Sequence, residues 1–259
     1  MTGLRVLAYA FEVGWAELRR DIWLPTWIVR IVFTALFFSL VGQLLNSPDQ
    51  LRYLVVGNAV AAGALATAIA VAVSTWDRYD GTYPLLVIAP TPLILPTLGR
   101  TACRLVSGIG ASLIALVMLG PLFQVPAPWP AVLLVVPLVV VVCTSCFGFM
   151  LQLGAVANLA PNARNLLHNV ATMSLMAFCG VNVPVSFWPD WLQASVQILP
   201  LTHGLAAIRA LLGGESAEIV TQQAGFELLV GFGWFALAML TMDRMADAGR
   251  ASGSIEVMR

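Results

Sequence analysis

Long apolar segments with very few charges constrain this chain more than any other feature. Six of them occur, and short polar stretches separate them. Each is close to the ~20 residues that an α-helix needs to cross the hydrocarbon core of a bilayer. The six segments are residues 27–45, 54–75, 103–123, 131–157, 166–185 and 226–242. The pattern predicts an all-α polytopic membrane protein with six transmembrane helices.

The composition leaves little room for another class of protein. Of the 259 residues, 59% are hydrophobic and only 10% are charged, whereas a soluble domain has about 25% charged residues. We therefore expect one transmembrane domain over residues 1–259, with no sizeable soluble domain and no basic patch for nucleic acid. The first apolar segment begins late and no basic stretch directly precedes it, so a cleaved signal peptide is not expected.

The arginines predict the orientation in the membrane. All 13 basic residues are arginines. With six spans both termini lie on one side, and 11 of the arginines lie on that side; only Arg52 and Arg209 lie on the other. Because basic residues favour the cytoplasmic side, both termini and the loop at residues 76–100 are expected in the cytoplasm.

Residues 1–24 precede the first span and are predicted to form an amphipathic helix. Apolar residues recur there every three or four positions, with Arg19 among the polar residues between them. Phe11 lies on the apolar face, and Trp15 suits the headgroup level. Pro25 is expected to end the helix. Two compatible interpretations remain: an anchor on the membrane surface, or an elbow helix that also contacts a partner.

The loop at residues 76–100 is polar and proline-rich. Acidic and basic residues precede Gly81 there, and an apolar turn follows. We expect a short helix that docks on something outside the membrane, with Gly81 allowing the backbone to turn into it. Leu85, Leu86 and Ile88 would then enter a groove on the partner. The residues assigned to docking on the partner, and so to coupling with it, are Asp77, Asp80, Gly81, Thr82, Tyr83, Leu85, Leu86 and Ile88.

The segment 186–214, between the fifth and sixth spans, is too polar to cross the membrane. Its apolar positions have the spacing of a half-buried helix. It is predicted to be a hairpin that dips into the outer leaflet, or two short helices that lie on it. Trp188 and Trp191 would mark the interface.

Ionisable residues are rare within the spans. Glu227 and Asp243 are predicted at the two ends of the sixth span, and Arg104 near a cytoplasmic end, where its guanidinium can reach water. A proton-coupled pump requires ionisable groups deeper in the membrane. The sequence therefore argues against a proton-driven antiporter.

No motif of an enzyme or of a nucleotide-binding protein is present. Cys143 and Cys146 have metal-ligand spacing, but they lie in an apolar run and are expected to be small core residues. His168 and His203 lie on opposite sides, so each is expected to be a hydrogen-bonded structural or interfacial residue. The chain is predicted to be no enzyme and to hold no cofactor or metal.

The spans contain uncharged polar residues whose role stays open. They either form hydrogen bonds between helices, or they line a cavity for an amphipathic substrate together with adaptable apolar side chains. The residues assigned to a possible substrate path, all on the first, second and fifth spans, are Phe33, Phe37, Asn58, Asn169, Met173 and Met176.

These features together resemble the type-2 ATP-binding-cassette (ABC) exporter permeases, which include daunorubicin-resistance and nodulation-factor export permeases. The resemblance covers nearly the whole chain, with one departure at Pro84, where relatives often have glutamate. The segments that carry it are Asp77-Arg78-Tyr79-Asp80-Gly81-Thr82, Leu86, Thr91-Pro92, Pro189-Asp190-Trp191-Leu192-Gln193, Pro200-Leu201-Thr202-His203 and Arg209-Ala210-Leu211.

The resemblance implies a permease of a bacterial inner (plasma) membrane that exports an amphipathic or lipid-like substrate, such as a drug, an antibiotic or a glycolipid. It implies two partners: a second permease, identical or homologous, and a cytoplasmic ATPase subunit that binds ATP and Mg. It also places the substrate path at the interface between the two permeases. The alternative is a membrane anchor or sensor subunit that recruits a cytoplasmic partner without transport.

Overall fold

The computed structural model describes most of the chain, and every regular element in the described part is a helix. The described residues are 3–20, 29, 33, 37, 41, 44, 47–71, 75, 81, 83–88, 91–125, 129, 131–159 and 161–252. Most of the predicted first span lies outside them. The elements are α1 (Gly3–Arg20), α3 (Pro48–Ala66), η1 (Thr67–Ile69), α5 (Tyr83–Ile88), α6 (Ile94–Leu122), α7 (Ala131–Leu159), η2 (Pro161–Ala163), α8 (Arg164–Phe178), η3 (Val185–Phe187), α9 (Asp190–Val196), α10 (Thr202–Leu212) and α11 (Ala217–Ser252).

Four of these helices are long and apolar enough to cross a membrane. They cover Pro48–Ile69, Ile94–Leu122, Val132–Leu159 and Ala217–Asp247. They match the predicted second, third, fourth and sixth spans. The prediction of a helical, multi-pass membrane protein is confirmed to this extent.

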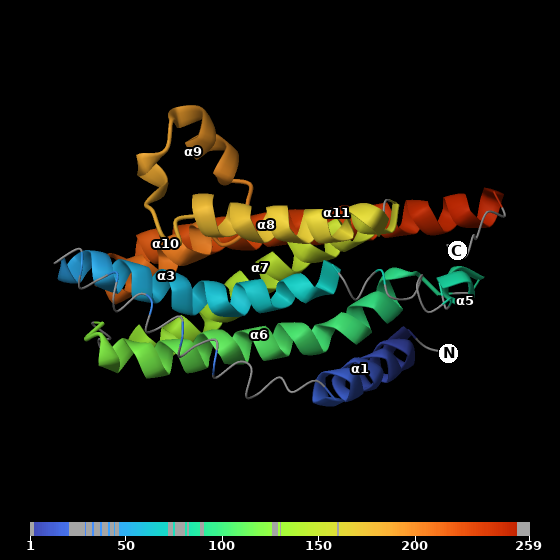
Figure 1. Cartoon of the computed structure of the whole chain (residues 1–259), viewed down its shortest axis with the longest axis horizontal. Coiled ribbons are helices and arrows are strands. Elements are labelled where there is room, and N and C mark those ends of the chain that lie inside the picture. The colour runs from blue at the N-terminus through green and yellow to red at the C-terminus, as the bar shows by residue number, and fades with distance from the viewer. Residues whose placement is uncertain are drawn as a thin grey trace.

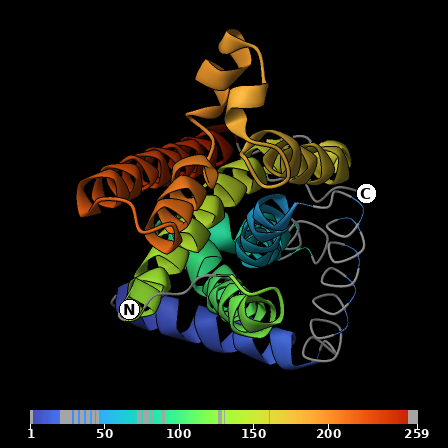
Figure 2. The same cartoon turned by 90° about the vertical axis from the view of Figure 1, so that its left-hand side faces the viewer.

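The long helices run along the long axis of the molecule (Figure 1). Helices α1 and α5 and the last turns of α11 lie at one end, which we call the terminal end. The start of α3, the last turns of α6, and α10 lie at the other, the distal end. Figure 2, which looks along the bundle, shows α1 lying across it. This is the orientation expected of an amphipathic helix on a membrane surface.

Helix α3 is the central helix, because its sequence lets neighbours come close. Of the residues in its most apolar stretch, 67% are buried, against 22% of those in α11. Gly63 faces the backbone carbonyl of Gly108 on α6, with no room for a Cβ atom. The Ser112 hydroxyl donates a hydrogen bond of 2.8 Å to the Val60 carbonyl. Small residues and hydroxyl groups at the α3–α6 contact are the usual means by which membrane helices pack.

We expect Gly63→Ala to destabilise the protein by about 1–3 kcal/mol, because a methyl group there overpacks the α3–α6 contact. Gly110→Ala is the matched control, since nothing lies within 4 Å of a Cβ atom at that position. Thermal unfolding in detergent, followed by size-exclusion chromatography, measures both variants. Equal midpoints for the two would show that the close approach of α3 and α6 does not limit stability.

The predicted span 166–185 is wrong beyond residue 178. Helix α8 ends at Phe178 after 15 residues, which is about 22 Å at 1.5 Å per residue and shorter than the ~30 Å hydrocarbon core. Gly180 then takes a positive φ of 79°, a conformation that glycine adopts at little cost. The chain turns there and continues through α9 and α10. Helix α10 packs on α7 and α11, whereas α9 projects sideways from the bundle (Figure 1).

Candidate functional site

Helix α1 is seated closely on the first turns of α6. Gly99 leaves no room for a Cβ atom beside Ala10 and the Leu7 carbonyl, and Gly14 is equally close to the Arg100 carbonyl. Gly99 and Arg100 fall within the loop predicted at residues 76–100, but in the structure residues 94–100 are the first turns of α6. A displacement of this end of α6 must therefore involve α1.

Among the assigned elbow residues, the rings of Phe11 and Trp15 stack in α1, with centroids 6.1 Å apart and planes 15° from parallel. Arg19 lies in the same helix, but its side chain is outside the described part. The predicted amphipathic helix is thus present, from Gly3 to Arg20.

The short helix α5 lies where a docking helix is predicted. Gly81 precedes it with a φ of 69°, in the left-handed region that favours glycine. The rest of the coupling set is only partly described. Asp77, Asp80 and Thr82, as well as the side chains of Tyr83 and Ile88, lie outside the described residues.

The two leucines of α5 point in different directions. Leu85 is 64% exposed. Leu86 instead packs on Leu93 and on Ala246 of α11. Leu86 therefore fixes α5 to α11, and its predicted contact with a partner stays a prediction. Among the described side chains of α5, Leu85 is the exposed one and offers apolar surface to a partner.

At the distal end, Arg209 of α10 fills the break after α8. Its guanidinium donates hydrogen bonds to the carbonyls of Gly180 (2.7 Å), Tyr53 (3.0 Å) and Val181 (3.3 Å). It also lies over the Tyr53 ring, 3.4 Å from the centroid, where a cation–π attraction adds to the hydrogen bonds. Burial lowers the pKa of Arg209 to about 10, so the group is still charged at neutral pH. One side chain thus ties α10 and α3 to the end of α8.

Glu227 of α11 holds the start of α10. Its carboxylate is fully buried and accepts hydrogen bonds from the backbone N–H groups of Leu201 (2.8 Å) and Gly204 (2.9 Å). These are donors that a helix N-terminus leaves unpaired, and a negative charge there is favoured by the helix dipole. Leu201 has a strained positive φ of 81°, which the surrounding contacts must hold in place. Nearby, the Trp234 indole donates to the Ile198 carbonyl at 2.8 Å.

Two predictions for charged residues are corrected by this geometry. Glu227 does not lie at the end of its helix as predicted, because α11 begins ten residues earlier and α10 covers the carboxylate. Arg104 is 6% exposed, so its guanidinium does not reach water as predicted. In both cases neighbouring helices bury a charge that the linear sequence places near a polar boundary.

The histidines and cysteines contribute to packing and hydrogen bonding in the described part of the chain. His168 Nδ1 lies 3.1 Å from a backbone carbonyl of η1, and His203 Nδ1 lies 2.8 Å from the Gln223 side-chain oxygen, which confirms the predicted structural roles. Cys143 and Cys146 are buried and unbridged. In the part of the chain that the structure describes, no three His, Cys, Asp or Glu side chains gather as metal ligands.

Comparison with known families assigns this architecture. The family model of the ABC-2 type transporter matches residues 16–212, from within α1 through the end of α10. The chain belongs to the ABC-2 type transporter family. A search of the curated proteins gave no match. The resemblance read from the loop and hairpin motifs is confirmed, and the chain is a membrane component of an ABC transporter, a kind of subunit that is not itself catalytic and normally works with an ATPase subunit.

Several of the assigned path residues of this ABC-2 permease lie on its surface. Phe33, Phe37 and Met173 are 67%, 60% and 69% exposed. Asn169 of α8 is also exposed, whereas Met176 packs partly against the core. The exposed apolar members place their side chains on the surface of the protein.

Asn58 differs from these residues. It is 4% exposed and donates hydrogen bonds to the Leu54 carbonyl (2.9 Å) and to the Asn182 side-chain oxygen (3.0 Å). The first bond lies within α3, and the second joins α3 to the turn after α8. These bonds give Asn58 a structural role, and its assignment to the substrate path stays a prediction.

Proposed function

We propose that this ABC-2 permease exports an amphipathic or lipid-like substrate, with energy from a separate cytoplasmic ATPase that binds ATP and Mg. It would work as a pair with a second permease, identical or homologous. The observation that carries the proposal is the arrangement at the terminal end. There α5, which carries the exposed Leu85, lies at the same end of the bundle as α1 and the last turns of α11, in a family that normally works with an ATPase subunit.

The contacts of α5 support a route for the motion. Leu86 fixes α5 to α11, and α6 begins only six residues after α5 ends. Helix α1 is seated on that start of α6. A push on α5 by the ATPase would therefore reach α6, α11 and α1 together, through packed and rigid elements. At the distal end, Arg209 and Glu227 tie the hairpin to α3 and α11, so it would move with them.

We expect Leu85→Asp to reduce co-purification with the ATPase by about tenfold or more, because an aspartate would bring an unpaired charge into an apolar groove. The thermal midpoint of the permease alone should not change, since Leu85 is exposed. Leu86→Asp is the contrasting variant, because it should lower the midpoint by disturbing Leu93 and Ala246. If Leu85→Asp retains the ATPase as well as the wild type does, α5 is not the docking element.

We expect Phe37→Ala and Met173→Ala to change substrate selectivity more than they reduce the maximal transport rate. An amphipathic substrate is bound mainly by dispersed apolar contacts, so each side chain contributes a part of the affinity. A panel of hydrophobic drugs and lipid precursors measures the profile, with Phe232→Ala on exposed α11 as control. An unchanged profile in both variants, with a changed one after substitution on α6 or α7, would place the path on other helices.

A further inference from the structure

An apolar cavity lies near the distal end, between α3, α6, α7 and the end of α10. Its volume is about 320 Å³, which is within the usual range of ligand sites. Every lining residue is aliphatic, glycine or proline, among them Val55, Leu116, Val135 and Leu212. A cavity without polar groups does not hold ordered water. Its occupant must therefore be apolar.

The cavity opens sideways between α6 and α7. Val117, Val132 and Val136 form part of its wall and are 73%, 37% and 44% exposed. Both helices are membrane-spanning by length and composition, so the opening faces the hydrocarbon of the bilayer. An acyl chain of a membrane lipid can enter the cavity from the hydrocarbon without crossing a polar layer.

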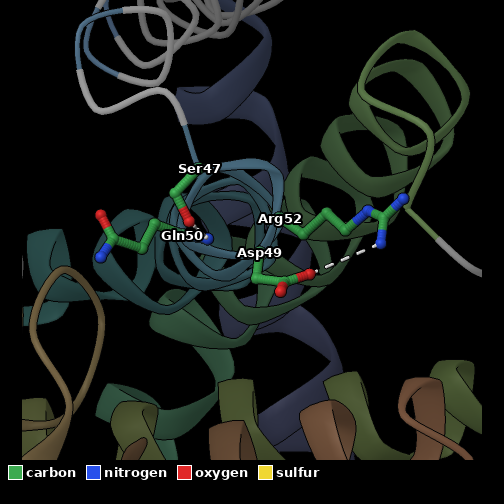
Figure 3. Close-up of polar contacts among 4 residues, drawn as sticks. All are labelled: Ser47, Asp49, Gln50 and Arg52. Carbon is green, nitrogen blue, oxygen red and sulfur yellow. Dashed lines mark hydrogen bonds and ion pairs between the residues drawn. The ribbon is translucent and has the colours of Figure 1, made fainter.

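A positive charge lies one helical turn from the cavity. Arg52 precedes the lining residues Val55 and Val56 by three and four positions, so the three share one face of α3. Figure 3 shows its side chain extending away from α3. The Arg52 side chain is 39% exposed, and its ion pair with Asp49, three residues earlier, is long at 3.7 Å and exposed to solvent. Such a pair contributes little and does not prevent a phosphate from binding.

The structure describes Arg52 and Arg209 at the distal end. Of these two, Arg52 is available to a ligand, because Arg209 is engaged with three backbone carbonyls. A guanidinium binds phosphate through two parallel hydrogen bonds. Four residues of α-helix separate Arg52 from Val56, which is about 6 Å along the axis. This separation is short enough for one lipid to place its phosphate on Arg52 and the start of an acyl chain at Val56.

We propose that this cavity and Arg52 form a binding site for one anionic phospholipid, with an acyl chain between α3, α6 and α7 and the phosphate on Arg52. The site is separate from the exposed residues Phe37 and Met173 of the proposed substrate path, and it needs no ATPase. The lipid would brace the α6–α7 corner against α3, at the end of the bundle opposite the docking helix.

The test uses the full-length protein in nanodiscs that contain phosphatidylglycerol with a photoreactive diazirine in the acyl chain. After illumination, mass spectrometry locates the lipid adducts. Gly120→Leu fills the cavity, because Gly120 lines it and has open space for a side chain. Gly110→Leu is the matched control on the same helix, also with open space but not in the cavity wall. Adducts should map to residues 113–136, fall about tenfold in Gly120→Leu and persist in Gly110→Leu.

The headgroup is tested with the same probe on phosphatidylcholine. Arg52→Gln should reduce the preference for phosphatidylglycerol by about tenfold, which corresponds to about 1.4 kcal/mol, whereas Arg244→Gln on exposed α11 should not. The proposal is overturned by adducts spread evenly over the exposed face of α11, or by equal yields in wild type and Gly120→Leu. It is also overturned by an unchanged lipid preference in Arg52→Gln, or by crosslinks to a second copy of the chain in place of lipid.

Discussion

Glu227→Ala should lower the free energy of unfolding by roughly 2–6 kcal/mol, because two buried N–H groups lose their acceptor and each costs ~1–3 kcal/mol when unsatisfied. The groups belong to Leu201 and Gly204 at the start of α10. The strained backbone of Leu201 also loses the contact that holds its positive φ. We expect a lower thermal midpoint in detergent and an α10 that is cleaved by protease at concentrations that leave the wild type intact.

Two further variants distinguish the effect of the Glu227 carboxylate from the effect of removing any acidic residue from α11. Glu227→Gln keeps one acceptor and turns an amide donor toward the second N–H group, so an intermediate midpoint is expected. Glu218→Ala removes an exposed acid from the same helix and should change the midpoint little. A midpoint for Glu227→Ala that equals the Glu218→Ala midpoint would show that α10 is held by its apolar contacts alone.

Arg209→Met should have an effect of similar size, about 2–5 kcal/mol, because it leaves three backbone carbonyls without their charged donor. Those carbonyls lie on α3 and in the turn after α8. The methionine keeps much of the apolar volume, so the loss reports the hydrogen bonds and the contact with Tyr53. Labelling of a cysteine introduced at Ser186 should become faster as the turn loosens.

Lysine cannot replace the guanidinium, because a single ammonium group lacks the planar set of donors that reaches all three carbonyls. Arg209→Lys should therefore resemble Arg209→Met, while Arg244→Met, at an exposed position of α11, should resemble the wild type. Full stability of Arg209→Lys would show that the charge matters and the donor geometry does not.

The sequence predicts the spanning helices well, because about 20 apolar residues in a row is a local signal. It fails at α8, since Val181, Val183 and Val185 continue the apolar run past the point where the backbone turns. Gly180 with Pro184 soon after it is the signal that separates the two cases, as glycine and proline mark the ends of helices.

The distal contacts could not be predicted from hydropathy. Glu227 lies beside an apolar run, and only the arrival of α10, which begins 25 residues earlier, makes it a buried cap. The sequence feature that points to this role is an acidic residue at a span, in a chain whose other predicted spans contain no acidic residue. The direction of Leu86 likewise depends on Ala246, which is far along the chain. A helix as short as α5 carries no periodicity from which its faces could be assigned.

The most direct test of the central claim is ATP-driven movement of a fluorescent amphiphile in inverted membrane vesicles that contain the permease and its ATPase. We expect uptake that requires ATP and Mg, is lost in Leu85→Asp, and persists when a proton gradient is collapsed. Uptake that continues without hydrolysable ATP, or that Leu85→Asp leaves unchanged in vesicles containing the ATPase, would contradict the account.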